Sequence, residues 1–172
     1  MNLTTLKIET ILAINPRSLT RYQIGWLTQD QIGGLTRYQI GGLTRYQIGG
    51  LTEENQTALF GDASVPKVDK LYSRILDDIE HKKRKLDQST FGPNCNPETN
   101  LCKTPMCIAG HTVNLAGDAG YALKDRFSFE IAAHLIHRAS CPDFPEPRYD
   151  SYPNEWALSY IREIAAIEGK QP

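Results

Sequence analysis

An eight-residue motif, LTRYQIGG, is repeated almost without change near the start of this 172-residue chain. Copies begin at Leu19, Leu27, Leu35 and Leu43, and a degenerate fifth copy begins at Leu51. The Arg-Tyr pair is replaced by Gln29-Asp30 in the second copy and by Glu53-Glu54 in the fifth. Because so short a unit cannot bury its own apolar residues, each copy has to pack against other copies.

The motif does not suit a β-strand or one long helix. A strand would place Leu35 and Arg37 on one face, so the face would be part apolar and part charged. A two-residue hairpin would also set Ile40 opposite Leu43 and mix the two faces. In a continuous helix, paired glycines every eighth residue would be unfavourable by about 1 kcal/mol each.

Each of the first four copies instead carries the Thr-x-x-Gln pattern of a capping box, which predicts the start of a helix. The acidic replacements agree, because acidic groups are favoured in the first turn, and we expect the glycines to end each helix in the left-handed conformation. We therefore predict a mostly α protein: a short solenoid of one-turn helical octapeptide repeats followed by a small helical domain. A flexible spacer, or a recent duplication with little consequence, is the alternative for the repeats.

The predicted organisation has three parts. An N-terminal segment covers residues 1–18, the repeat solenoid covers 19–61, and a helical domain that contains the cysteines and histidines covers 62–172. Apolar residues at helical spacing predict helices over about 67–86 and 126–139. A last helix, after a proline-rich loop, is marked by Trp156, Tyr160, Ile164 and Ile167.

Composition limits the classes of function. The 19 basic and 20 acidic residues give a net charge of -1, which makes nucleic acid an unlikely partner. No apolar run approaches the ~20 residues of a membrane span, so no membrane partner is expected. Lys7 and Glu9 interrupt the stretch that a signal peptide keeps apolar, so we expect a cytoplasmic protein.

The C-terminal half contains a constellation of cysteines and histidines. Thr104-Pro105 is typical of a helix start, which would place Cys107 in the first turn, where a helix lowers the pKa of a thiol. His111 would lie one turn later on the same face. On the helix predicted over 126–139, a second polar stripe contains Glu130, His134 and His137, and Cys141 continues it.

This constellation has three interpretations. The cysteines can be structural and buried, because a free cysteine packs as a small hydrophobe. They can also bind zinc with nearby histidines, or Cys107 and His111 can form a nucleophilic pair. The candidate metal ligands are Cys102, Cys107, His111, His134, His137 and Cys141.

Part of the chain resembles a group of short uncharacterised bacterial and phage proteins. The matching stretches are Leu76 to Glu80, Leu86 to Gln88, Cys102 to His111 and Leu115 to Asp118, within about 67–138. That group shows an ILxxIE helix, a WDQ tripeptide, CGTxxCxAGW and then LAG, and this chain departs from it at Leu86, Lys103 and His111. The resemblance implies no activity. The octapeptides are similar to LTxxQ[IV] helix starts in bacterial helical-repeat proteins, which implies a binding scaffold.

The leading hypothesis is a non-enzymatic protein–protein interaction module. Arginine and tyrosine dominate the energetics of interfaces, and the repeats place Arg-Tyr pairs at regular intervals. The candidate interaction residues are Arg21, Tyr22, Arg37, Tyr38, Arg45 and Tyr46. The alternatives are a zinc- or thiol-dependent enzyme that uses the Cys102/Cys107/His cluster, and a phage or mobile-element protein that inhibits a host enzyme.

Overall fold

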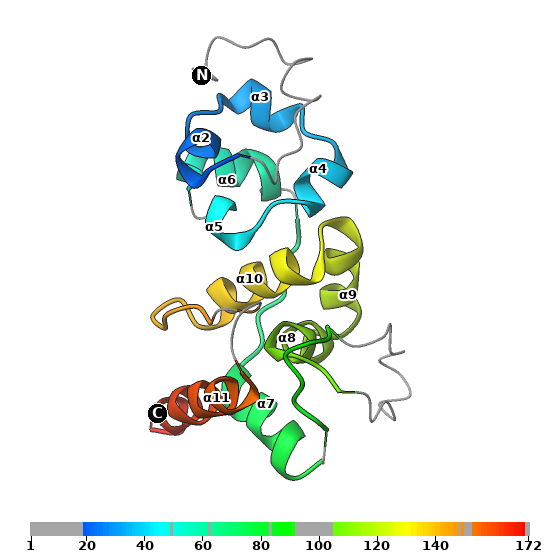
Figure 1. The fold of residues 1–172 in the computed structure, drawn as a ribbon, viewed down its shortest axis with the longest axis vertical. Helices are drawn as coiled ribbons and strands as arrows, with labels where there is room; N and C mark the ends of the chain where they lie inside the picture. Colours follow the sequence, from blue (N-terminus) through cyan, green and yellow to red (C-terminus); the bar gives the residue numbers. More distant parts are fainter. Residues whose placement is uncertain are drawn as a thin grey trace.

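The computed structural model describes residues 19–48, 50–61, 63–82, 84–91, 105–147, 149 and 153–170. The protein is mostly helical, as predicted. Within these ranges the one extended pairing is an isolated parallel bridge between Leu86 and Met106, and no helix is long and apolar enough to cross a bilayer. Helices α2 to α6 gather at one end of the molecule and α7 to α11 at the other (Figure 1).

Each octapeptide copy forms its own helix. The first four copies give α2 (Arg21–Gly25), α3 (Gln29–Gly33), α4 (Arg37–Gly41) and α5 (Arg45–Ile48). The fifth copy runs on into the longer α6 (Glu53–Phe60), which ends at Gly61. The leucine and isoleucine of the second and fourth copies are buried: Leu27, Ile32, Leu43 and Ile48 are each at most 4% exposed.

The predicted capping boxes are confirmed. At α2 the backbone N–H of Gln23 donates to Thr20 Oγ1 at 3.3 Å, and the backbone N–H of Thr20 donates to Gln23 Oε1 at 2.8 Å. Thr28 and Gln31 make the same two bonds at α3. Each helix therefore has its own start signal, and two of its orphan backbone donors are satisfied locally.

Helices that lie three copies apart in the sequence pack against each other, α2 against α5 and α3 against α6. A side-chain amide crosses each junction: Gln47 Nε2 donates to the carbonyl of Leu19 at 2.6 Å, and Asn55 Nδ2 donates to that of Leu27 at 2.7 Å. Gln47 thus has two roles, because its Oε1 also accepts from the backbone N–H of Thr44 at 2.8 Å.

The prediction that the repeat glycines adopt the left-handed conformation is wrong. Among the described glycines only Gly117 has a positive φ, and Gly34, which follows α3, has φ -81°. The glycines instead permit close approach. A Cβ on Gly25 would stand 2.6 Å from the carbonyl oxygen of Gly50, which no larger residue tolerates without movement of the backbone.

The C-terminal helices contact the repeat block next to α4, which is the helix of the third copy. A helix three copies later would belong to a sixth copy, and the sequence has none. Here the backbone of Phe127 takes the corresponding place, because a Cβ on Gly41 would lie 2.5 Å from the Phe127 carbonyl oxygen. The rings of Phe60 and Phe127 meet edge to face at 5.1 Å. Arg138 Nη1 also donates to Gln56 Oε1 at 2.6 Å, so apolar and polar contacts join the two ends of the molecule.

The C-terminal half contains α7 (Leu71–Glu80), α8 (Ile108–Leu115), α9 (Gly117–Arg126), α10 (Phe129–Ser140) and α11 (Asn154–Glu168). α7 packs on α11, and α8 packs on α10 (Figure 1). α7 is shorter than the helix predicted over 67–86. It begins after Lys70, which has a φ of 48°, and Glu168 caps it from α11 by accepting from the backbone N–H groups of Tyr72 at 3.1 Å and Ser73 at 2.7 Å.

Two further features differ from the sequence interpretation. α9 was not predicted, and Gly120 lies within it because its missing Cβ admits the carbonyl oxygen of Val113. The last helix is present, but Trp156 is 67% exposed and Ile167 is 40% exposed. The buried face of α11 is instead formed by Ala157, Ile161, Ile164, Ala165 and Glu168.

Candidate functional site

The two residues that follow each threonine are exposed wherever their side chains are described. Tyr22 is 77% exposed, and Gln29, Asp30 and Glu54 at equivalent positions are also exposed. The other positions of the motif are used internally: threonine and glutamine form the capping box, while leucine and isoleucine face the core. The helix therefore leaves this pair of positions to solvent wherever the side chains are described.

Of the six candidate interaction residues, the structure describes the side chain of Tyr22 alone. The others occupy first-turn positions of their helices, with side chains outside the described part: Arg21, Arg37, Tyr38, Arg45 and Tyr46. Trp26 follows α2 and is 52% exposed. Sequence reasoning did not select Trp26, although it stands where the second, third and fourth copies have glycine.

Cys107 lies immediately before α8, because the helix begins at Ile108 rather than at Pro105. The thiol is buried, and burial raises its pKa, although backbone N–H groups of Gly110 and Ala109 act in the opposite direction. The expected lowering of the pKa by the helix N-terminus is therefore outweighed by desolvation. Such a thiol is a poor nucleophile at neutral pH.

His111 is completely buried in α8, and neither ring nitrogen has a hydrogen-bond partner among the described residues. Burial lowers the pKa of His111 to about 4; the charge of Asp78 has a smaller raising effect, and that of Arg84 lowers the pKa further. The imidazole is therefore neutral at physiological pH. It packs in the core rather than acting as a base that reaches solvent.

His134 and His137 on α10 have partners of their own. His134 Nδ1 lies 2.7 Å from Glu146 Oε2, and His137 Nδ1 lies 2.8 Å from the Tyr72 hydroxyl. His137 Nε2 is 3.2 Å from the carbonyl oxygen of Phe144, and burial lowers the pKa of His137. These bonds hold the segment after α10 against the helix.

Cys141 belongs to the same buried polar group. Its thiol donates to Glu168 Oε1 at 3.6 Å, and burial, reinforced by the Glu168 carboxylate, raises the pKa of Cys141 to about 12. Among the described residues, no three histidine, cysteine, aspartate or glutamate side chains lie together as a metal site would require. Cys102 lies outside the described residues.

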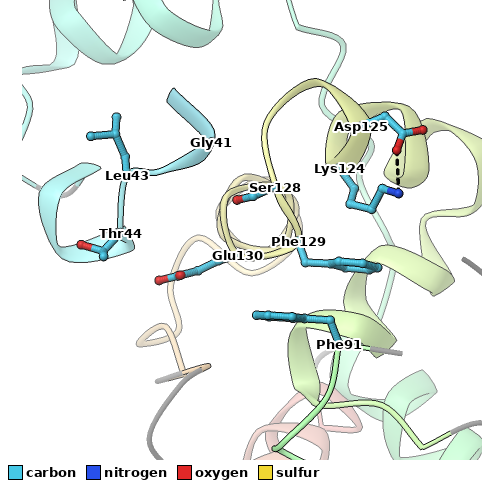
Figure 2. Close-up of a pocket in the computed structure, with 9 residues that line it drawn as sticks. All are labelled: Gly41, Leu43, Thr44, Phe91, Lys124, Asp125, Ser128, Phe129 and Glu130. Carbon is cyan, nitrogen blue, oxygen red and sulfur yellow. Dashed lines mark ion pairs between the residues drawn. The ribbon is translucent and has the colours of Figure 1, made fainter. Parts of the chain in front are cut away.

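A cavity of about 420 Å³ lies between the repeat helices and the C-terminal helices (Figure 2). Phe91 and Phe129 stack on one side with centroids 5.4 Å apart and planes at 7°. Lys124 Nζ stands 5.4 Å from the Phe129 ring centroid and pairs with Asp125 at 2.6 Å. Leu43 and other repeat residues face this group from the opposite side (Figure 2).

The cavity was not predicted, because Phe91 and Phe129 lie far apart in the sequence and no local motif connects them. Its stacked rings offer an apolar surface beside a lysine and a carboxylate. That arrangement suits binding of an apolar or planar group, because Lys124 is already engaged with Asp125.

Comparison with known protein families, with curated proteins and with solved structures finds no match to this chain. The function therefore has to be argued from the geometry alone.

Proposed function

We propose that the protein is a non-enzymatic binding module that contacts a protein partner through the exposed pair of each octapeptide. The observation that carries this proposal is that some positions of the motif are buried while others are exposed. Tyr22, Gln29, Asp30 and Glu54 are exposed, whereas Gln31, Gln39, Gln47 and Asn55 at the fourth position after the leucine are buried. Where the side chains are described, the copies thus use equivalent positions to build the scaffold and leave the pair after the threonine in solvent.

The proposed scaffold is a short solenoid with three helices per turn. The packing of α2 on α5 and of α3 on α6 supports it, because both pairs are three copies apart. The amide bonds of Gln47 and Asn55 support it as well, because each spans 28 residues. A further copy, three units along the sequence, would occupy the next turn, as stacked repeats do in larger solenoids.

The type of exposed residue favours a protein partner. Tyr22 and Trp26 are large aromatic side chains that the fold leaves in solvent, and aromatic residues with arginine are enriched at interface hot spots. Arginine and tyrosine occupy the pair in three of the five copies. The C-terminal helices would hold one end of the solenoid through the Phe60–Phe127 contact.

The test is quantitative affinity capture from an extract of the native host, with the full chain as bait. A Tyr22→Ala/Tyr46→Ala variant should retain at least about tenfold less of the specific partner, because truncation of aromatic anchors removes more than ~1 kcal/mol. A Trp156→Ala variant is the control, because it truncates an exposed aromatic residue outside the repeats, and it should retain the partner. Equal capture by the tyrosine variant and the wild type would refute the proposal.

Deletion of residues 35–42 distinguishes the proposed solenoid from a string of independent binding sites. In a string, one lost copy weakens binding in proportion to the number of copies. In the proposed solenoid the deletion places the fifth copy, with Glu53-Glu54, on the first copy, with Arg21-Tyr22. Capture should then fall as far as in the double tyrosine variant, and a merely proportional loss would argue against three helices per turn.

A further inference from the structure

The exposed pair of the repeats changes its charge with a period of three copies. In chain order the pairs are Arg-Tyr, Gln-Asp, Arg-Tyr, Arg-Tyr and Glu-Glu. The two acidic versions, Gln29-Asp30 and Glu53-Glu54, are therefore separated by the same three-copy interval that separates packed helices.

The packing of the helices sorts the pairs into two groups that differ in charge. Helices α2 and α5, which pack together, carry Arg21 and Arg45, and we call them the basic column. Helices α3 and α6, which also pack together, carry Asp30, Glu53 and Glu54, and we call them the acidic column. The pairs of the basic column thus contain two arginines and no acidic residue, and the pairs of the acidic column contain three acidic residues and no arginine.

The described side chains agree with this sorting. Tyr22, in α2, is 77% exposed, and Trp26, which follows α2, is 52% exposed, so the basic column presents aromatic side chains to solvent. Asp30 and Glu54, on the acidic column, are exposed as well. Charges at exposed positions steer association and set its specificity.

We infer that the basic column of one copy of this chain docks against the acidic column of a second copy. This inference rests on the proposed function and names its partner. The chain itself supplies the complementary surface, and its net charge of -1 produces little repulsion between copies. A nucleic acid fits less well, because phosphates bound at the basic column would approach Asp30 and Glu54 on the neighbouring column. A basic face that binds a different, acidic face is a heterologous contact, which closes into a ring or continues as a chain.

The experiment is sedimentation velocity on the full chain over a concentration series, at low and at high salt. Wild type should self-associate, and the dissociation constant should rise at least about tenfold at high salt, where exposed charges are screened. An Arg21→Glu/Arg45→Glu variant and an Asp30→Arg/Glu54→Arg variant should each stay monomeric, because like charges then face each other. A mixture of the two variants should associate, because each retains the column that the other lacks.

Controls separate this inference from misfolding and from the proposed function. A Lys170→Glu variant reverses an exposed charge after α11, outside the repeats, and should associate within about twofold of wild type; circular dichroism checks that each variant is folded. If a charge-reversal variant unfolds, Arg21→Ala/Arg45→Ala replaces it, with at least about tenfold weaker association expected. Monomeric wild type, or failure of the mixed variants to associate, would overturn the inference. The proposed function would survive that result if the Tyr22→Ala/Tyr46→Ala variant still lost a different partner.

Discussion

Replacement of Gln47 by glutamate tests the geometry on which both proposals depend. Glutamate is as good as glutamine in a capping box, so the local start of α5 should be unaffected. However, Gln47 is 4% exposed, and its Nε2 donates to the Leu19 carbonyl at 2.6 Å across the junction between copies. In Gln47→Glu this donor becomes a carboxylate oxygen that faces the carbonyl oxygen.

The magnitude follows from the loss of this donor. Removal of the donor leaves the Leu19 carbonyl without its partner at a partly buried junction, which costs about 1–3 kcal/mol. We expect the free energy of unfolding to fall by this amount. The matched control is Gln23→Glu: Gln23 makes the same capping-box bonds but belongs to the first described copy and is only half-buried. Its effect should stay within about 0.5 kcal/mol, as for other surface changes.

The assay is urea unfolding at neutral pH, followed by circular dichroism, for wild type and both variants. A large loss of stability in Gln47→Glu and little change in Gln23→Glu would support packing between copies that are three units apart. Equal effects of the two substitutions would refute packing between copies three units apart, because both glutamines would then contribute only through their own capping boxes. The slope of the transition with denaturant also has to stay constant for the comparison to measure native-state stability.

Three further predictions concern glycine packing, a buried histidine and a thiol. Gly41→Ala should destabilise by about 1–3 kcal/mol in thermal unfolding, because its Cβ would meet the Phe127 carbonyl at 2.5 Å, whereas Gly33→Ala, in open space, should be neutral or slightly stabilising. His111 has a pKa of about 4 in the folded protein and 6.5 in the unfolded chain, so below pH 6.5 the unfolded chain binds the extra proton. The stability of wild type relative to His111→Phe should therefore fall by about 2 kcal/mol at pH 5 and about 3 kcal/mol at pH 4. A stability difference that does not change with pH would contradict the burial of His111. Cys107 should react with iodoacetamide far more slowly in the native protein than in urea, and fast native modification would instead favour the catalytic thiol.

Local chemistry was readable from the sequence, whereas contacts between distant segments were not. Thr20 and Gln23 are close in the sequence, so the capping box could be predicted from their spacing. The packing of α2 on α5 could not, because buried leucine and isoleucine are compatible with several ways of stacking the copies. The one signal of this packing is the choice of glutamine at the third helical position, where a capping box accepts glutamate equally well. Gln47 uses its amide N–H for the bond to the Leu19 carbonyl, which glutamate could not make.

The candidate site shows the same limit. The start of α7 depends on Glu168, which is 95 residues from Ser73, and no local pattern announces such a cap. The effect of a helix N-terminus on Cys107 was predicted with the wrong sign, because the sequence does not show how deeply the thiol is buried. The cavity beside Phe91 and Phe129 likewise depends on tertiary packing. The exposure of the position that Tyr22 occupies follows from the motif, because the other side chains of each copy have internal partners.

The three-copy interval between packed helices also determines how the repeat block can change in length. Near-identical repeats gain or lose copies readily, one unit at a time. In the proposed solenoid, a change of three copies would add or remove one whole turn and leave each remaining pair beside its former type of neighbour. A change of one or two copies would turn the helix that meets Phe127 by a third or two thirds of a revolution. The number of repeats would then determine the angle between the C-terminal helices and the charged columns. Repeat blocks that differ by three copies would have the same angle and would be functionally equivalent.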